Sequence, residues 1–217
     1  ELVDLNLAGK KALITGASKG IGLAIAKRFA LEGCSVVLVA RSEDDLMQAQ
    51  RDILATDQRI GVDYRVANLS KTKEVSTLAK EQADIDILVN NAGAIPAGNI
   101  NRVDEVTWRE AWDLKLFGYI SLCREIYASM SARRDEPGQR VILNIIGAGG
   151  ERPSSGYIAG AGANAGLMAI TRAMGGVSRK HGIRVLGINP GQIVTERLET
   201  MQRVLAQEKF GDAERWK

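Results

Sequence analysis

Short apolar runs alternate with longer helical segments along this 217-residue chain, and this order constrains its fold more than any other feature. The apolar runs are predicted strands at residues 11–16, 35–40, 62–68, 85–91, 140–146 and 183–190. Predicted helices lie between them at residues 22–33, 43–55, 71–83, 104–133 and 157–180. Continuously apolar strands separated by helices form a parallel sheet that is covered on both faces. The sequence therefore predicts one α/β domain over residues 1–217, a Rossmann-type doubly wound parallel sheet.

Composition and charge narrow the class of protein. The hydrophobic fraction of 45% and charged fraction of 25% are those of an ordinary soluble domain. The net charge of +3 is small, and the Lys and Arg residues are interspersed with Asp and Glu. We therefore expect no nucleic acid and no membrane as partner. The chain has no apolar run of about 18 residues and no signal-peptide pattern, and its two cysteines, Cys34 and Cys123, suit a reduced, cytoplasmic protein. With one histidine, His181, and no Cys/His cluster, no metal site is expected.

The segment TGASKGIG, Thr15–Gly22, joins the first predicted strand to the first predicted helix. Gly16 permits a tight turn, Gly20 lets the backbone approach a pyrophosphate, and Gly22 allows close packing of helix on sheet. The helix N-terminus then offers unpaired N–H groups to an anion. Glycines in this strand–turn–helix context predict a dinucleotide site, and the alternative is a purely structural turn.

Three motifs together resemble those of the short-chain dehydrogenase/reductase family. They are TGxxxGIG at Thr15–Gly22, NNAG at Asn90–Gly93 and NPGQIVT at Asn189–Thr195, in the family's order. The resemblance covers nearly the whole chain and implies hydride transfer between a nicotinamide dinucleotide and a carbonyl or alcohol substrate. By this resemblance, Asn91–Gly93 line the adenosine side, and Ile193 and Thr195 hold the nicotinamide carboxamide. The full set of predicted cofactor-binding residues is Gly16, Ser18, Lys19, Gly20, Ile21, Gly22, Arg41, Asn68, Leu69, Asn91, Ala92, Gly93, Pro190, Gly191, Ile193 and Thr195.

Charge at the end of the second predicted strand indicates which dinucleotide is bound. An acidic residue there would bind the ribose 2′-OH and repel a 2′-phosphate, but the chain has Ala40 followed by Arg41. Lys19 lies inside the glycine segment. Two cations without a carboxylate favour NADP(H) over NAD(H), unless both are solvated surface charges. Asn68 stands where the family usually has Asp beside adenine, and an amide can still form a hydrogen bond there.

The chemical end of the site departs from the family. The resemblance implies a Ser, a Tyr, a Lys and an Asn that carry the reaction. In the ungapped register these positions hold Gly147, Gly160, Asn164 and Lys115, so none of the four expected residues is in its place. Asn and Lys have exchanged positions, and Tyr157 lies three residues before the vacated tyrosine position, about one helical turn away.

This pattern leads to a hypothesis of a rewired site with catalytic residues Tyr157, Lys115 and Asn164. Lys115 would supply the positive charge that lowers the pKa of the Tyr157 phenol, while Asn164 holds the substrate or a water. The alternatives are that Lys115 sends its ammonium into water, that Tyr157 only lines the cleft, and that Asn164 caps or cross-links backbone. Ser154 and Ser155 are further candidates for contacting substrate.

The Gly- and Ala-rich segment after Tyr157 also predicts assembly. Small side chains let two helices approach closely, and the resemblance implies a homodimer or homotetramer built on paired helices. Residues 195–217 are expected to form a substrate lid, and the C-terminal strand that the family adds is expected to be missing. Two functions follow: an NADP(H)-dependent oxidoreductase, or an inactive NADP(H)-binding sensor or partner subunit on the same scaffold.

Overall fold

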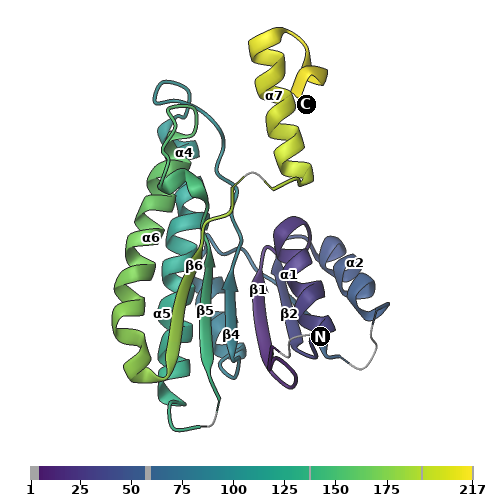
Figure 1. Ribbon diagram of the computed structural model, residues 1–217, viewed down its shortest axis with the longest axis vertical. Coiled ribbons are helices and arrows are strands. Elements are labelled where there is room, and N and C mark those ends of the chain that lie inside the picture. Colours follow the sequence, from purple (N-terminus) through teal and green to yellow (C-terminus); the bar gives the residue numbers. More distant parts are fainter. Residues whose placement is uncertain (1–4, 57–59, 137, 192, 217) are drawn as a thin grey trace.

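The computed structural model describes residues 5–56, 60–136, 138–191 and 193–216; the ends of the predicted domain, residues 1–4 and 217, lie outside them. It contains a six-stranded parallel sheet with the order β3-β2-β1-β4-β5-β6 (Figure 1), which confirms the predicted fold class. The strand order reverses between β1 and β4, and this reversal creates the crevice in which doubly wound sheets bind ligands. The strands are β1 (Lys11–Thr15), β2 (Ser35–Ala40), β3 (Val62–Val66), β4 (Ile87–Asn90), β5 (Arg140–Ile145) and β6 (Ile183–Ile188).

Helices cover the sheet on both faces. The helices are α1 (Gly20–Leu31), α2 (Glu43–Leu54), α3 (Thr72–Glu81), α4 (Glu105–Trp112), α5 (Gly118–Ala132), α6 (Ile158–Ser178) and α7 (Glu196–Phe210). Short helical turns are η1 (Asp113–Phe117), η2 (Ala148–Gly150), η3 (Arg179–His181) and η4 (Ala213–Trp216). No helix among the described residues is both long enough and apolar enough to cross a bilayer.

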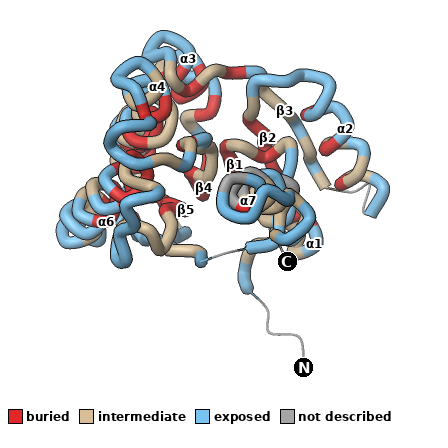
Figure 2. The backbone as a smooth tube through the Cα atoms, turned by 90° about the horizontal axis from the view of Figure 1, so that it is seen from above, coloured by how far each residue is buried: buried red, intermediate tan, exposed pale blue. Residues whose placement is uncertain are grey.

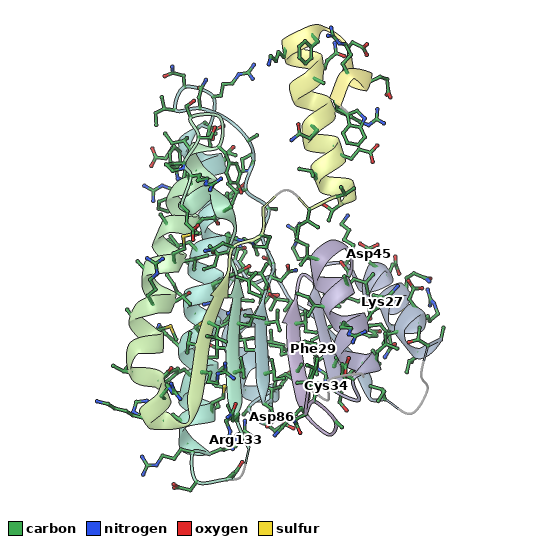
Figure 3. The ribbon with its side chains drawn as sticks, viewed as in Figure 1. Lys27, Phe29, Cys34, Asp45, Asp86 and Arg133 are labelled. Atoms are coloured by element: carbon green, nitrogen blue, oxygen red, sulfur yellow. The ribbon has the colours of Figure 1, made fainter. Side chains whose placement is uncertain are left out.

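Two apolar layers hold these helices to the sheet. Residues of α1 and α2, such as Ala26 and Leu46, pack against alternate strand residues such as Ile14. The other strand residues, such as Leu13, face α3 and α5. Because side chains alternate between the faces of a strand, continuously apolar strands supply both layers (Figure 3).

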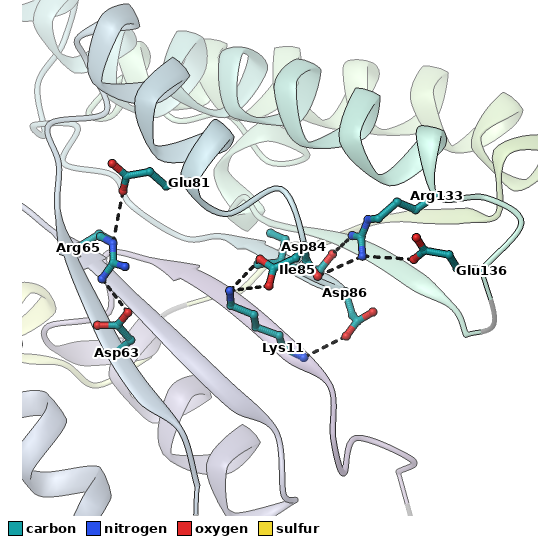
Figure 4. A network of polar contacts seen from close by, with 9 residues as sticks. All are labelled: Lys11, Asp63, Arg65, Glu81, Asp84, Ile85, Asp86, Arg133 and Glu136. Carbon is teal, nitrogen blue, oxygen red and sulfur yellow. Dashed lines mark hydrogen bonds and ion pairs between the residues drawn. The ribbon is translucent and has the colours of Figure 1, made fainter.

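The amino edge of the sheet is closed by ion pairs and hydrogen bonds (Figure 4). Lys11 Nζ lies 2.7 Å from an Asp84 carboxylate oxygen, and the Lys11 backbone N–H donates to Asp86. Arg133 donates to the carbonyl oxygens of Asp84 and Ile85. These contacts occupy the amino edge of the sheet, and a ligand-binding site is expected at the opposite, carboxyl edge.

The predicted helix over residues 104–133 is interrupted at one point. Between α4 and α5 the backbone winds as a π-helix, η1, from Asp113 to Phe117. A π segment takes up an extra residue and so changes which side chains face the core. Lys115 lies in this segment, so its direction could not be read from an uninterrupted helical periodicity.

The last helix lies apart from these layers. Figure 1 places α7 beyond the carboxyl ends of the strands, and Figure 2, seen from above, places it over β1 and α1. Thr195 begins α7 by accepting a hydrogen bond from the Leu198 N–H at 3.3 Å. Within this unit Arg203 pairs with Glu199 and Glu214 and lies over the Trp216 ring.

Candidate functional site

The glycine turn after β1 has the conformation that the sequence predicts. Gly16 and Gly20 adopt φ of +64° and +58°, a region that side chains with a β-carbon rarely enter. A β-carbon on Gly22 would lie 2.6 Å from Asn91 Nδ2 and still closer to the Gly16 carbonyl oxygen. The turn therefore requires all three glycines.

The N-terminus of α1 fits an anion. Lys19 occupies its N-cap position without a side-chain cap, and the first turn holds no acidic residue. Ile21 sends its side chain towards the core, so it can offer a ligand only its backbone, and Ser18 is half-buried beside the turn. Uncapped N–H groups and the helix dipole suit a pyrophosphate at this point.

Thr15 and Asn91 hold the glycine turn to the end of β4. The Thr15 hydroxyl accepts from the backbone N–H groups of Asn91 (2.9 Å) and Ala92 (3.0 Å). Asn91 Nδ2 donates to the carbonyl oxygens of Thr15 (3.0 Å) and Gly16 (3.2 Å). Asn91, predicted to line the adenosine side, thus uses its Nδ2 group to hold the glycine turn. The part played by the Thr15 hydroxyl was not predicted from the sequence.

The ends of β2 and β3 carry the next predicted residues. Arg41 follows β2 directly, is exposed, and forms no hydrogen bond or ion pair with any residue that the structure describes. Lys19 is exposed at the N-cap of α1, on the glycine turn. Asn68 follows β3 and is half-buried, whereas the Leu69 side chain is only 4% exposed and packs in the core. The cations fit a phosphate because an unpaired guanidinium at this edge has charge and donors to offer.

The segment after β6 crosses back over the glycine turn. The Pro190 carbonyl oxygen accepts from the Ala148 N–H at 2.9 Å, and Gly191 and Ile193 are exposed. Thr195 Cγ2 lies 3.8 Å from the β-carbon position of Gly20. The predicted nicotinamide residues therefore border the same crevice as the predicted phosphate residues.

Tyr157 stands at the N-cap of α6, and its ring lies over Gly160. A β-carbon on Gly160 would be 2.6 Å from Tyr157 Cε2 and closer still to Cζ and Cε1, far inside ordinary carbon contact. The ring also borders Gly149, whose β-carbon position lies 3.4 Å from Tyr157 Cδ1. The Tyr157 ring thus fills the space where a side chain of residue 160 would begin, at the position where the resemblance implied a tyrosine.

The backbone of Tyr157 is held by the loop after β4. Gly98 and Tyr157 form an isolated parallel bridge, in which the Gly98 N–H donates to the Gly156 carbonyl oxygen (2.7 Å) and the Ile158 N–H donates to that of Gly98 (3.2 Å). The exposed Ser154 orders the same turn by accepting from the Gly156 N–H at 3.3 Å. Gly98 was not predicted from the sequence, where the only signal is a glycine two residues after Pro96; in the structure it adopts φ of +155°.

Lys115 reaches from η1 to the end of β5. Its Nζ donates to the carbonyl oxygens of Ile145 (3.1 Å) and Ile146 (2.9 Å), and it lies 5.2 Å from the centre of the Tyr119 ring. The stem lies over Gly93, where a β-carbon would come within 2.5 Å of Lys115 Cδ. Two carbonyls and an aromatic face favour the charged ammonium, and Tyr119 is a further residue that the sequence analysis missed.

Asn164 is buried within α6 at 3% exposure and faces the loop after β5. Its Nδ2 lies 3.0 Å from the β-carbon position of Gly147 and 3.6 Å from that of Gly149. Its Oδ1 is buried without a hydrogen-bond partner in the described part of the chain. A buried acceptor of this kind fits a site that a ligand or water completes.

A buried polar chain beneath this site links four elements. Asn90 Nδ2 donates to Asn144 Oδ1 at 2.9 Å, and Asn144 Nδ2 donates to Thr171 Oγ1 at 2.9 Å. Cys123 lies 3.2 Å from Asn90 Nδ2, and burial raises the pKa of its thiol to about 12. This buried polar chain ties α5 and α6 to β4 and β5. Helix α6 carries Asn164, and η1, which carries Lys115, leads directly into α5.

Comparison with known proteins identifies the class. The family model of the short chain dehydrogenases matches residues 10–205. The chain is 33% identical over 193 residues to a 3-oxoacyl-(acyl-carrier-protein) reductase of Vibrio cholerae, covering 88% of this chain and 77% of that reductase. This chain therefore belongs to the short-chain dehydrogenase family and is an oxidoreductase of that type.

Solved structures agree with this assignment. L-sorbose reductase from Gluconobacter frateurii, complexed with NADPH and L-sorbose, matches with a TM-score of 0.87 at 30% identity, over 98% of this chain and 80% of the reductase. NAD⁺-bound xylitol dehydrogenase shares the fold, with a TM-score of 0.86 at 20% identity over 96% of this chain and 82% of that one. Proteins of this fold thus bind nicotinamide cofactors of both kinds.

Proposed function

We propose that this protein transfers hydride between NADP(H) and a carbonyl or alcohol substrate through a rewired site of Tyr157, Lys115 and Asn164. The observation that carries the proposal is the position of the Tyr157 ring, which fills the space left by the missing side chain of Gly160. The three residues border one segment: Lys115 binds Ile146, Asn164 faces Gly147 and Gly149, and Tyr157 borders Gly149.

We assign each of the three side chains a role in this reaction. When bound, the reduced nicotinamide supplies a hydride to the carbonyl carbon of the substrate. Tyr157 Oη donates its proton to the carbonyl oxygen, and the phenolate that results recovers a proton from solvent. The Lys115 ammonium, anchored by two carbonyls, stabilises the negative charge on the phenolate. Asn164 Oδ1 accepts a hydrogen bond from a substrate hydroxyl or a water.

The cofactor preference rests on Arg41 and Lys19. Arg41 is exposed, makes no ion pair within the described residues and follows β2, whose last residue is Ala40 and not the acidic residue that would repel a 2′-phosphate. The NADPH bound by L-sorbose reductase supports the same choice. Arg41→Asp should weaken NADPH binding by roughly 10- to 100-fold, the worth of a charge-assisted hydrogen bond, and strengthen NADH binding in calorimetry. Unchanged affinities would remove Arg41 from the proposal.

We also infer that the protein forms a homo-oligomer. The outer face of α6 carries small, exposed residues, including Gly162 and Ala165, which permit close helix packing. A hollow of about 540 Å³ on α4 and η1 borders it, and Phe117 on its rim is 53% exposed. If this face forms the interface, Phe117→Asp should lower the mass measured by analytical ultracentrifugation.

The two free cysteines support a reducing, cytoplasmic setting for the protein.

Activity separates the two functions that the sequence left open. NADPH binding is measured by calorimetry, and turnover of a panel of carbonyl and alcohol substrates by nicotinamide absorbance. We expect Tyr157→Phe to lower kcat by roughly 10²- to 10⁴-fold with NADPH affinity nearly unchanged. NADPH binding by a wild-type protein that turns over no substrate would favour the sensor. Full activity of Tyr157→Phe would refute the rewired site.

A further inference from the structure

The indole of Trp112 joins two elements of the proposed site. Trp112 is the last residue of α4, and its Nε1–H donates to the carbonyl oxygen of Ala159 at 2.9 Å. Ala159 is the second residue of α6 and is fully buried. A carbonyl oxygen has two lone pairs, so it can accept this hydrogen bond as well as one within the helix. The bond therefore attaches the end of α4 to the first turn of α6.

The ring of Trp112 is held against the same helix. Trp112 Cζ2 lies 3.2 Å from the β-carbon position of Gly162, about one turn beyond Ala159. Trp108, one turn earlier on α4, meets the ring edge to face, with centroids 6.0 Å apart and an angle of 68° between the planes. Because Gly162 has no side chain, the indole has room to reach α6.

Both residues proposed for proton transfer lie close to this bond along the chain. Tyr157 precedes Ala159 by two residues, and Lys115 follows Trp112 by three. The Tyr157 carbonyl oxygen accepts from the Ala161 N–H at 2.9 Å, so the tyrosine is joined to the same first turn of α6. Lys115 lies in η1, which begins directly after Trp112. One hydrogen bond thus links the segment that carries the phenol to the segment that carries the ammonium.

We propose that Trp112 is a positioning residue, whose hydrogen bond to Ala159 sets the separation of Tyr157 and Lys115. This inference rests on the proposed function, in which the Lys115 ammonium lowers the pKa of the Tyr157 phenol. Because η1 interrupts the helix between α4 and α5, a regular helical ladder does not fix where Lys115 lies, and the bond from α4 to α6 supplies a fixed point. An increase of about 1 Å between two close charges shifts a pKa by roughly half a unit.

Titration of Tyr157, followed by NMR of tyrosine with an isotope label at Cζ, tests this without turnover. Tyr157→Phe identifies the signal among those of the four tyrosines. Lys115→Met should raise the pKa of Tyr157, as the proposed function requires. Trp112→Phe keeps an aromatic ring but removes the N–H donor, and it should raise the same pKa by about half a pH unit or more. It should also lower kcat by roughly 10- to 100-fold, with NADPH affinity within about twofold of wild type.

A second variant separates the donor from the shape of the ring. Benzothiophene in place of the Trp112 indole keeps both fused rings but has sulfur where the indole has its N–H, and it should raise the pKa of Tyr157 as Trp112→Phe does. Trp108→Phe is the matched control, because it removes an indole from the same helix and leaves the bond from Trp112 to Ala159 in place. It should leave the pKa of Tyr157 and kcat near their wild-type values.

The outcomes separate this inference from the function on which it rests. A Tyr157 pKa that the benzothiophene variant leaves unchanged would overturn the inference, because any effect of Trp112→Phe would then come from ring size. An equal shift with Trp108→Phe would overturn it as well. A Tyr157 pKa that Lys115→Met leaves unchanged would instead remove the rewired site itself.

Discussion

Substitution of Gly160 by alanine tests the position of the Tyr157 ring directly. The added β-carbon would lie 2.6 Å from Tyr157 Cε2 and closer to two other ring carbons, against an ordinary carbon separation of about 3.5–4.0 Å. Either the ring moves off the helix or the helix moves under it. Because Tyr157 is the proposed proton donor, we expect a fall in kcat with NADPH affinity retained.

The magnitude follows from two opposing terms. Alanine stabilises a helix interior by up to about 1 kcal/mol relative to glycine, and overpacking costs about 1–3 kcal/mol. Gly160→Ala should therefore lower the free energy of unfolding by up to about 2 kcal/mol in the wild-type protein. In a Tyr157→Ala background no ring opposes the β-carbon, and the same change should stabilise by about 0.5–1 kcal/mol. The difference is a coupling free energy of about 1–3 kcal/mol.

Urea unfolding of the four proteins in this double-mutant cycle measures the coupling. Gly176→Ala is the matched control, because it lies in the same helix, is exposed and has no atom within 4 Å of its β-carbon position. It should stabilise both backgrounds equally. If Gly160→Ala also stabilises both backgrounds equally, the ring does not lie over Gly160 and the reasoning fails.

Three further predictions follow from individual contacts in the structure. Lys115→Met leaves the Ile146 carbonyl without its donor, so urea unfolding should show a loss of about 1–3 kcal/mol and turnover should fall; unchanged stability would contradict the Nζ contacts. Gly98→Ala is opposed by φ of +155° and by Val103 Cγ2 at 2.6 Å; we expect kcat to fall without a change in NADPH affinity, and an unchanged kcat would separate this loop from Tyr157. A hydrogen bond from Lys11 holds the pKa of Asp84 below its usual 3.8, so the pair stabilises the fold at neutral pH and ceases to do so as the pH falls through 3.8 towards the folded pKa. Asp84→Asn should therefore cost less than about 1 kcal/mol at neutral pH and nothing in strong acid; a cost that persists in acid would exclude the pair as its cause.

The sequence by itself determined the parts of this protein that depend on local chemistry. The alternation of apolar strands with helices predicted the parallel sheet, because each strand is apolar on both of its faces and this can be read from its own residues. The turn from Gly16 to Gly22 was predicted as well, because only glycine suits its dihedral angles and its close packing. The position of Arg41 directly after β2 was also predicted, because it depends only on where one strand ends.

The tertiary structure alone decided how the unusual site residues are used. Lys115 binds carbonyls 30 and 31 residues away, and the π segment that aims it interrupts an otherwise regular helix. Trp112 donates to the carbonyl oxygen of Ala159, 47 residues away. The Tyr157 ring lies on Gly160 because the loop at Gly98 holds its backbone. The directions of these side chains depend on contacts between segments that are distant in the sequence, and these contacts cannot be read from residue spacing along the chain.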